Sequence, residues 1–154
     1  SRTDRLFADL NDGLPFPSRY DRRHDLSVVL EWRIDDRWKL GGTFIYGTGN
    51  AITVPSQRYF VDGNLLDVYG PRNGFRMPAY HRADFGATLD PRVKPGKKRR
   101  GQWVFSVYNL YNRQNPFFIY FNNDGDLSEG TLDIQAYQVS LFPILPSVTW
   151  NFKF

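Results

Sequence analysis

The chain has 154 residues, a formal net charge of +4 at pH 7 and no cysteine, and 17% of its residues are aromatic. The lack of cysteine excludes a disulfide framework and a thiolate metal site. No stretch approaches the roughly 18 consecutive apolar residues that a membrane-spanning helix needs. Helix-forming residues are sparse, and Gly, Asn, Asp and Pro punctuate the sequence, so the composition predicts an all-β protein with one domain.

Five segments alternate apolar and polar residues, which is the pattern of a strand whose two faces differ. In chain order they are residues 25–34, 38–47, 80–89, 103–121 and 137–154. The fourth segment loses its alternation around residues 111–113, which suggests a bulge. The fifth contains Pro143 and Pro146, so we expect its first half to be irregular or locally unpaired.

The turn between the first two segments follows from their faces. Cross-strand neighbours share a face of the sheet, so Ile34 must pair with a residue on the apolar face. A two-residue turn would place it opposite Arg37, which belongs to the polar face. A three-residue loop at 35–37 pairs it with Trp38, and this is the turn that we predict.

The connections between the segments alternate in length. Short or moderate turns span residues 35–37 and 90–102, whereas longer loops span 48–78 and 122–136. In an antiparallel up-and-down meander the two kinds of connection lie at opposite rims, as they do in outer-membrane barrels.

The positions of the tryptophans indicate a membrane protein and not a water-soluble one. In this meander they map to one face and to the short-turn rim, where they form an aromatic girdle at the level of lipid headgroups; they are Trp32, Trp38, Trp103 and Trp150. A soluble sandwich also alternates apolar and polar residues, but it has no reason to collect its tryptophans at one height.

Candidate chemistry in the sequence is sparse. The basic run at residues 92–100 contains Pro95-Gly96 and no interleaved aromatic residue, so we expect a solvated turn and no nucleic-acid site. Asn122, Asp124 and Asp126 have the oxygen spacing of a calcium loop, but the glycine that should follow is Leu127, which favours an ordinary turn. No nucleophile, phosphate-loop or catalytic-triad pattern is present, so we expect neither an enzyme nor a cofactor.

The loop at 48–78 carries the candidate contact residues. Two interpretations stay open: contact with substrate or a lipoprotein lid, or a loop packed on its own aromatic residues. The contact residues would be Arg58, Tyr59, Tyr69 and Arg72.

Longer motifs span nearly the whole chain. They read YDRRHDL at 20–26, YGTGNAITVP at 46–55, YGPRNGFRMPAYHRAD at 69–84, YNLYNRQNPF at 108–117 and LFPILPSV at 141–148. In this order they resemble the TonB-dependent receptors that carry a carboxypeptidase-like regulatory domain, relatives of the SusC-type transporters. The terminal Phe154, with Trp150 and Phe152 before it, resembles the aromatic signal that the outer-membrane assembly machinery recognises.

The resemblance implies an antiparallel up-and-down meander that forms the last five strands of a 22-stranded transmembrane β-barrel. It also implies a plug domain, energy from the TonB complex, and in some members a SusD-like surface lipoprotein. We therefore expect a part of a nutrient transporter (for glycan, peptide or metal chelate) in the outer membrane of a Gram-negative bacterium. The chain would be a fragment of such a protein, or it would complete its wall with other polypeptide. The alternative is a soluble all-β module that binds carbohydrate or another ligand.

Overall fold

The computed structural model describes residues 2–61, 64–92, 100–125, 131 and 133–153. Every sheet in this part of the chain is antiparallel wherever a register is resolved, and the helical content is one short 3-10 turn, Asn11–Gly13. The chain divides into two compact units. The loop unit comprises Ser1–Asp25 and Gly47–Tyr80, and the sheet unit comprises Leu26–Tyr46 and His81–Phe154.

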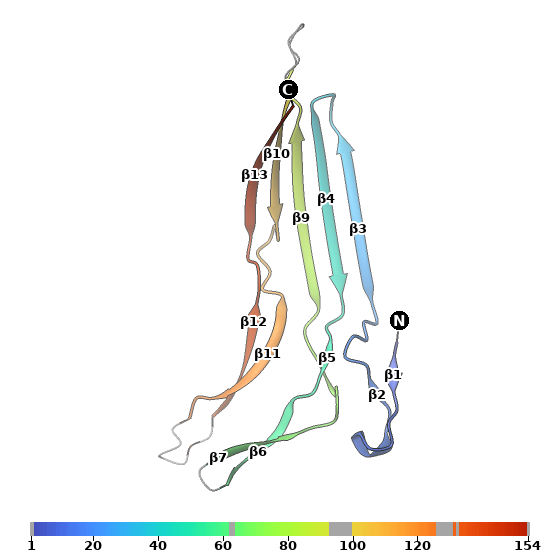
Figure 1. The fold of residues 1–154 in the computed structure, drawn as a ribbon, viewed down its shortest axis with the longest axis vertical. Helices are drawn as coiled ribbons and strands as arrows, with labels where there is room; N and C mark the ends of the chain where they lie inside the picture. The colour runs from blue at the N-terminus through green and yellow to red at the C-terminus, as the bar shows by residue number, and fades with distance from the viewer. Residues whose placement is uncertain (1, 62–63, 93–99, 126–130, 132, 154) are drawn as a thin grey trace. The chain divides into compact units, whose positions relative to one another are not determined.

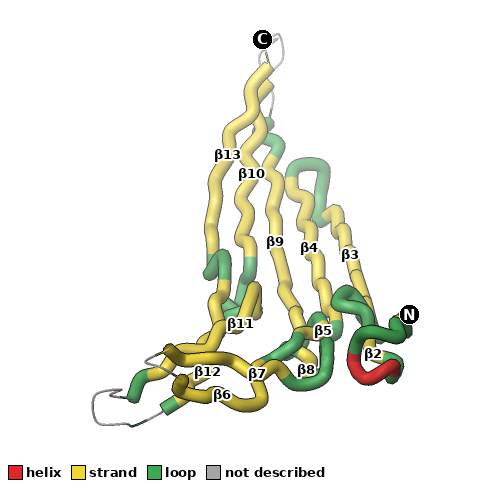
Figure 2. Tube along the Cα trace, turned by 60° about the horizontal axis from the view of Figure 1, so that its bottom comes forward, coloured by secondary structure: helices red, strands yellow, loops and turns green. Residues whose placement is uncertain are grey.

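Five long strands make up the main sheet. They are β3 (Asp25–Arg33), β4 (Trp38–Gly47), β9 (Tyr80–Leu89), β10 (Arg100–Tyr108) and β13 (Leu145–Lys153). Their spatial order is β13-β10-β9-β4-β3, so each long strand lies beside the next one along the chain (Figures 1 and 2). The all-β, up-and-down meander predicted from the alternation is therefore confirmed.

The strand register brings apolar residues together across the sheet. Trp103 of β10 lies opposite Leu89 of β9 on one side and Trp150 of β13 on the other. Phe105 likewise lies between Ala87 and Val148. Because a shift of one residue would move every side chain to the opposite face, this pairing fixes one apolar face and one polar face.

The first hairpin has the predicted three-residue loop. The backbone N–H of Ile34 donates to the carbonyl of Trp38 at 3.0 Å. The carboxylate of Asp35 accepts the backbone N–H groups of Arg37 and Trp38 at 2.7 and 2.6 Å. These bonds, that from Trp38 first, hold the pKa of Asp35 below its ordinary value, because they stabilise the charged form.

The fourth and fifth segments were each predicted as one strand, and each is two. After β10 the chain breaks and continues as β11 (Pro116–Asn123), which pairs with β12 (Ile134–Ser140) in a separate two-stranded sheet. The predicted bulge is wrong, since Asn109 and Asn112 have φ near +55° and end the strand. Pro143 lies in the second break, as expected, but Pro146 lies within β13 in register with Val107.

The connection at 48–78, predicted as a loop, contains four short strands. They are β5 (Ala51–Ile52), β6 (Pro55–Val61), β7 (Asn64–Tyr69) and β8 (Phe75–Arg76). β6 pairs with β7 as a hairpin, and β5 pairs with β8. In the same loop unit, β1 (Asp4–Arg5) pairs with β2 (Phe16–Pro17). Backbone pairing therefore orders a segment that the sequence predicted as a long loop.

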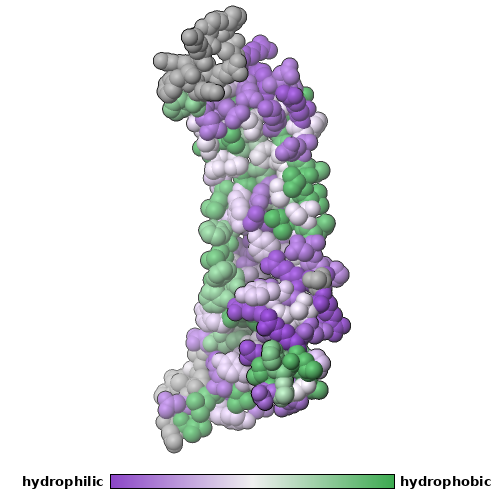
Figure 3. Space-filling model, turned by 45° about the vertical axis from the view of Figure 1, so that its right-hand side comes forward, coloured by the Kyte–Doolittle hydropathy of each residue, from purple (hydrophilic) through white to green (hydrophobic). Residues whose placement is uncertain are grey.

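The buried apolar residues all belong to the loop unit. Among the described residues they are Phe16, Ala51 and Met77. The five long strands contribute none, and Figure 3 shows hydrophobic side chains exposed at the surface over these strands. The described part of the sheet is thus held together by its backbone ladder and cross-strand contacts, and its described side chains form no hydrophobic core.

Candidate functional site

The apolar face of the main sheet is exposed along its length. Leu30 is 69% exposed, Phe85 40% and Val148 62%. The other large exposed residues of this alternation are Leu26, Val28, Trp32, Ile34, Phe44, Trp103, Phe105, Trp150 and Phe152. Large exposed apolar patches mark surfaces that contact lipid or another protein.

The four tryptophans lie in the halves of their strands that are nearer the turn at 35–37 and the connection at 90–102. Trp32 is near the end of β3 and Trp38 begins β4, on either side of the first turn. Trp103 and Trp150 are directly opposite each other on β10 and β13, with ring centroids 5.9 Å apart. The structure therefore brings two of the four girdle candidates into contact and places the other two around one hairpin.

The residues of the predicted assembly signal continue this aromatic surface. Trp150 and Phe152 share a face of β13, and their ring centroids are 5.1 Å apart. Trp103 also stacks on Phe105 along its own strand, at 6.3 Å. Phe154 lies outside the described residues. Trp103, Phe105, Trp150 and Phe152 are called the aromatic cluster below.

The opposite face of the sheet carries a hydrogen-bonded polar ladder. The carboxylate of Asp90, just past β9, accepts from Gln102 at 2.9 Å and from the ammonium of Lys39 at 3.3 Å. These two bonds, that from Gln102 first, hold the pKa of Asp90 below its ordinary value. Further along the face, Ser106 and Ser147 share a hydrogen bond of 2.7 Å. The two faces of this sheet therefore differ sharply in chemistry.

A buried asparagine joins the two breaks in the sheet unit. Asn109 is 1% exposed, and its carboxamide accepts from the backbone N–H of Arg113 at 2.9 Å. The same carboxamide donates to the carbonyls of Arg113 and Phe142, both at 3.0 Å. Its backbone N–H donates to the carboxylate of Asp84. Asn109 was not among the site residues predicted from the sequence, although the YNLYNRQNPF motif contains it.

A second asparagine fixes the start of β9. The carboxamide of Asn115 accepts the backbone N–H of His81 at 3.0 Å and donates to its carbonyl at 2.9 Å. The imidazole of His81 in turn shares a 2.7 Å hydrogen bond with the hydroxyl of Tyr111. Both asparagines thus replace missing backbone partners at points where the long strands stop, which satisfies buried polar groups.

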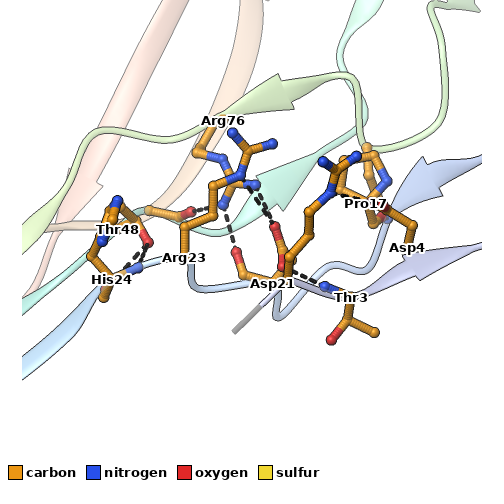
Figure 4. Close-up of polar contacts among 11 residues, drawn as sticks. Thr3, Asp4, Pro17, Asp21, Arg23, His24, Thr48 and Arg76 are labelled. Atoms are coloured by element: carbon orange, nitrogen blue, oxygen red, sulfur yellow. Dashed lines mark hydrogen bonds and ion pairs between the residues drawn. The ribbon is translucent and has the colours of Figure 1, made fainter.

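An ion pair between a buried carboxylate and a partly exposed guanidinium organises the loop unit (Figure 4). The fully buried carboxylate of Asp21 accepts the backbone N–H of Thr3 and the guanidinium of Arg76, each at 2.7 Å. The bond from Thr3, then that from Arg76, hold the pKa of Asp21 below its ordinary value. Arg76 also donates to the carbonyl of Gly49 at 2.9 Å. One pair therefore joins three segments that are far apart in sequence.

Close backbone contacts surround this pair. A side chain at Gly49 would place its Cβ 1.9 Å from the carbonyl oxygen of Met77, so only glycine fits. His24 and Thr48 exchange backbone and side-chain hydrogen bonds nearby. The motifs at 20–26, 46–55 and 69–84 thus converge on one polar cluster around the buried carboxylate of Asp21, called the Asp21 cluster below.

The predicted contact residues of the loop unit differ in their surroundings. The guanidinium of Arg58 forms an ion pair with Asp67 across the β6–β7 hairpin. Tyr59 and Tyr69 are 52% and 62% exposed, and the Tyr59 hydroxyl donates to Gln57. The backbone N–H of Arg72 donates to the side chain of Asn11. The tyrosine rings present free surface, while Arg58 holds its own hairpin together.

Two of the calcium candidates, Asn122 and Asp124, share a hydrogen bond. The carboxylate of Asp124 accepts from the amide of Asn122 at 2.8 Å and from the hydroxyl of Tyr137. Asp126 lies outside the described residues. In the described part of the chain, no group of three or more His, Cys, Asp or Glu residues is placed to hold a metal.

No protein-family model, no curated protein and no solved structure matches this chain. Where the structure is described, no helix has the length and apolar character to cross a membrane. What the molecule offers for function is an exposed apolar sheet face, a polar face behind it and two ordered polar clusters.

Proposed function

We propose that this chain is the carboxy-terminal part of the wall of an outer-membrane TonB-dependent transporter, with the apolar face of its main sheet against lipid. The five strands would be the last of a 22-stranded barrel. Nutrient uptake would then be energised by the TonB complex through the plug and other parts of the protein, and the strands themselves would carry no catalytic group.

The observation that carries this proposal is the exposed apolar face of an otherwise well-paired sheet. In a soluble sandwich the apolar face packs on a second sheet about 10 Å away and is buried. Here the described residues of the five strands bury no apolar side chain, and Leu30, Phe85 and Val148 remain open. Lipid would cover such a face without a second protein layer.

The asymmetry of the two strand ends supports the same orientation. The tryptophans gather at the end that carries the short turns, and indole rings favour the membrane interface. Outer-membrane barrels have short turns on the periplasmic side and longer loops outside. In this orientation the Trp103–Trp150 pair lies at the periplasmic interface.

The polar face suits a water-filled lumen. It carries the ladder of Lys39, Asp90 and Gln102 and the Ser106–Ser147 hydrogen bond. Barrel strands alternate lipid-facing apolar residues with lumen-facing polar ones. A sheet with one face of each kind therefore matches the demands of a barrel wall.

The two edge strands of the main sheet need further strands as neighbours in a membrane. Among the described strands, β3 and β13 lie at the two ends of the order, each with one neighbour in the sheet. Lipid cannot satisfy the free N–H and carbonyl groups of an edge strand. We therefore place further strands against both edges, supplied by other polypeptide.

Membrane extraction and a pair of arginine variants test the proposal. The protein should fractionate with outer membranes, resist carbonate extraction and stay monodisperse only in detergent. Trp150→Arg should block membrane assembly while Ser147→Arg is tolerated, because only Trp150 belongs to the apolar face. A protein that is monodisperse in water, or equal assembly of the two variants, contradicts the proposal.

A further inference from the structure

A glycine lies beneath the indole of Trp150. Gly101 is on β10, in register with Phe152, and this pair is two positions along the ladder from the Trp103–Trp150 pair, on the same face of the sheet. A Cβ at Gly101 would lie 2.8 Å from Nε1 of Trp150, 3.6 Å from Cε2 and 3.8 Å from Cζ2. The nitrogen-bearing edge of the indole therefore occupies the space that any other residue at position 101 would fill.

The other glycines of the long strands do not share this feature. A Cβ at Gly41 would meet nothing within 4 Å, and at Gly42 or Gly86 the nearest atom would be a backbone oxygen at 4.0 or 3.8 Å. At Gly47 the nearest atom would be on Arg22 at 3.4 Å. Among the described glycines of these strands, only Gly101 has an approach below 3 Å.

The space left by the missing side chain of Gly101, called the seat below, adjoins the aromatic cluster. Leaning over Gly101, the indole of Trp150 still stacks on Trp103, with an interplanar angle of 23°. It also contacts Phe152, with an interplanar angle of 35°. Three rings from two strands are therefore ordered by contacts with one another and by one missing side chain.

We infer that Gly101 is a positioning residue for the Trp150 indole: its bare backbone is the seat that orients the aromatic cluster. This inference depends on the proposed function in one respect, that the interfacial layer of the lipid covers the aromatic cluster. Its mechanism is steric, because a methyl group at position 101 displaces the ring and leaves the backbone ladder in place.

Circular dichroism tests the seat directly. Two indoles that stack closely couple their transitions and give an exciton couplet, which is measured as the difference spectrum against Trp150→Phe in detergent-solubilised protein. Gly101→Ala should lose most of this couplet while the β-sheet signal stays. Gly42→Ala is the matched control on the same face and should retain the couplet. An intact couplet in Gly101→Ala overturns the inference.

A double variant keeps the test informative when Gly101→Ala assembles poorly. A phenylalanine at position 150 lacks the Nε1 atom that a Cβ at Gly101 would strike. Gly101→Ala should therefore reduce assembly yield several-fold less in the Trp150→Phe background than in the parent. An equal loss in both backgrounds refutes the seat. A protein that is water-soluble but keeps a Gly101-dependent couplet would instead refute the membrane proposal and leave the seat intact.

Discussion

A charged residue at Phe85 gives the sharpest test of the lipid-facing surface. Phe85 is in register with Val107, four residues along β10 from Trp103 (103 to 107). At roughly 3.4 Å per residue this is about 14 Å along the strand, or about 10 Å along the membrane normal for a tilt of roughly 45°. The apolar band is about 25 Å tall, so Phe85 would lie close to the bilayer midplane.

The expected cost follows from this depth. An arginine on the lipid face costs about 2–4 kcal/mol at the midplane and about 0–1 kcal/mol near the interface. At roughly 1.4 kcal/mol per factor of ten, Phe85→Arg should lower the folding equilibrium constant about 30-fold to 700-fold. Val148→Arg should cost less, since Val148 is only two residues from Trp150 (148 to 150) and so about 5 Å deep.

Denaturant titration of the protein in phospholipid vesicles measures these differences. Ser147→Arg is the control on the polar face, and Phe85→Leu is the control that keeps the apolar character. The depth argument predicts the order Phe85→Arg, then Val148→Arg, then Ser147→Arg, from most to least destabilised. Equal costs for Phe85→Arg and Ser147→Arg would refute the assigned faces, and a larger cost at Val148 would refute the depth.

Three further substitutions test the polar clusters. Asp21→Asn removes the charge that Arg76 neutralises, so the loop unit should melt at lower temperature. Because the pKa of Asp21 lies below its ordinary 3.8, the stabilisation by its charge is complete above about pH 4 and is lost as pH falls through the lowered pKa. Gly49→Ala should force a Cβ into the Met77 carbonyl and abolish β5–β8 protection in hydrogen exchange. Asn109→Gly keeps the positive φ but leaves buried backbone groups without their hydrogen-bond partner. The free energy of unfolding measured by denaturant titration should fall by about 1–3 kcal/mol.

Matched variants separate these effects from general damage. Asp9→Asn removes an exposed carboxylate of the same unit and should leave the acid transition unchanged. Gly42→Ala adds a methyl group that meets no atom closer than 4.0 Å and should keep normal exchange protection. Asn109→Ala should cost about 1–2 kcal/mol more than the glycine variant, because alanine is strained at positive φ. An unchanged acid transition in Asp21→Asn would contradict the role of its charge.

The long strands could be predicted because their signals are local. Alternation located all five, and the need to keep Ile34 on the apolar face determined the three-residue turn that the Ile34–Trp38 hydrogen bond confirms. Each of these inferences uses residues that are neighbours in sequence or across one turn. The two-residue alternation of a strand and the rule that paired residues share a face can be applied without knowledge of the rest of the fold.

The breaks in the fourth and fifth segments depend on contacts that alternation does not encode. Asn109 stops β10 because it adopts a positive φ and its carboxamide binds the backbone of Phe142, which is 33 residues away. The β6–β7 hairpin did have a local signal, since Asp62-Gly63 stands between two apolar stretches, and Asp-Gly is a preferred hairpin turn. Treating 48–78 as a single loop overlooked it.

The Asp21 cluster could not be derived from one sequence. Asp21 and Arg76 are 55 residues apart, and each stands in a stretch with other charged residues of the same kind. Pairing them requires knowing that β5 and β8 meet. The motifs at 20–26, 46–55 and 69–84 marked the right segments, but they did not say that these segments meet one another.

The carboxamide of Asn109 has a consequence for how the protein can diversify. It recognises main-chain atoms of residues 113 and 142 and no side chain at either position. These bonds do not depend on the side chain at position 113, whereas position 142 is also constrained by its positive φ of 56° and by the contact of the Phe142 ring with Tyr108. The β11–β12 hairpin can accumulate substitutions, and so acquire new external contacts, while β10 and β13 keep their register. One amide thus separates the register of the long strands from most side chains of the β11–β12 hairpin.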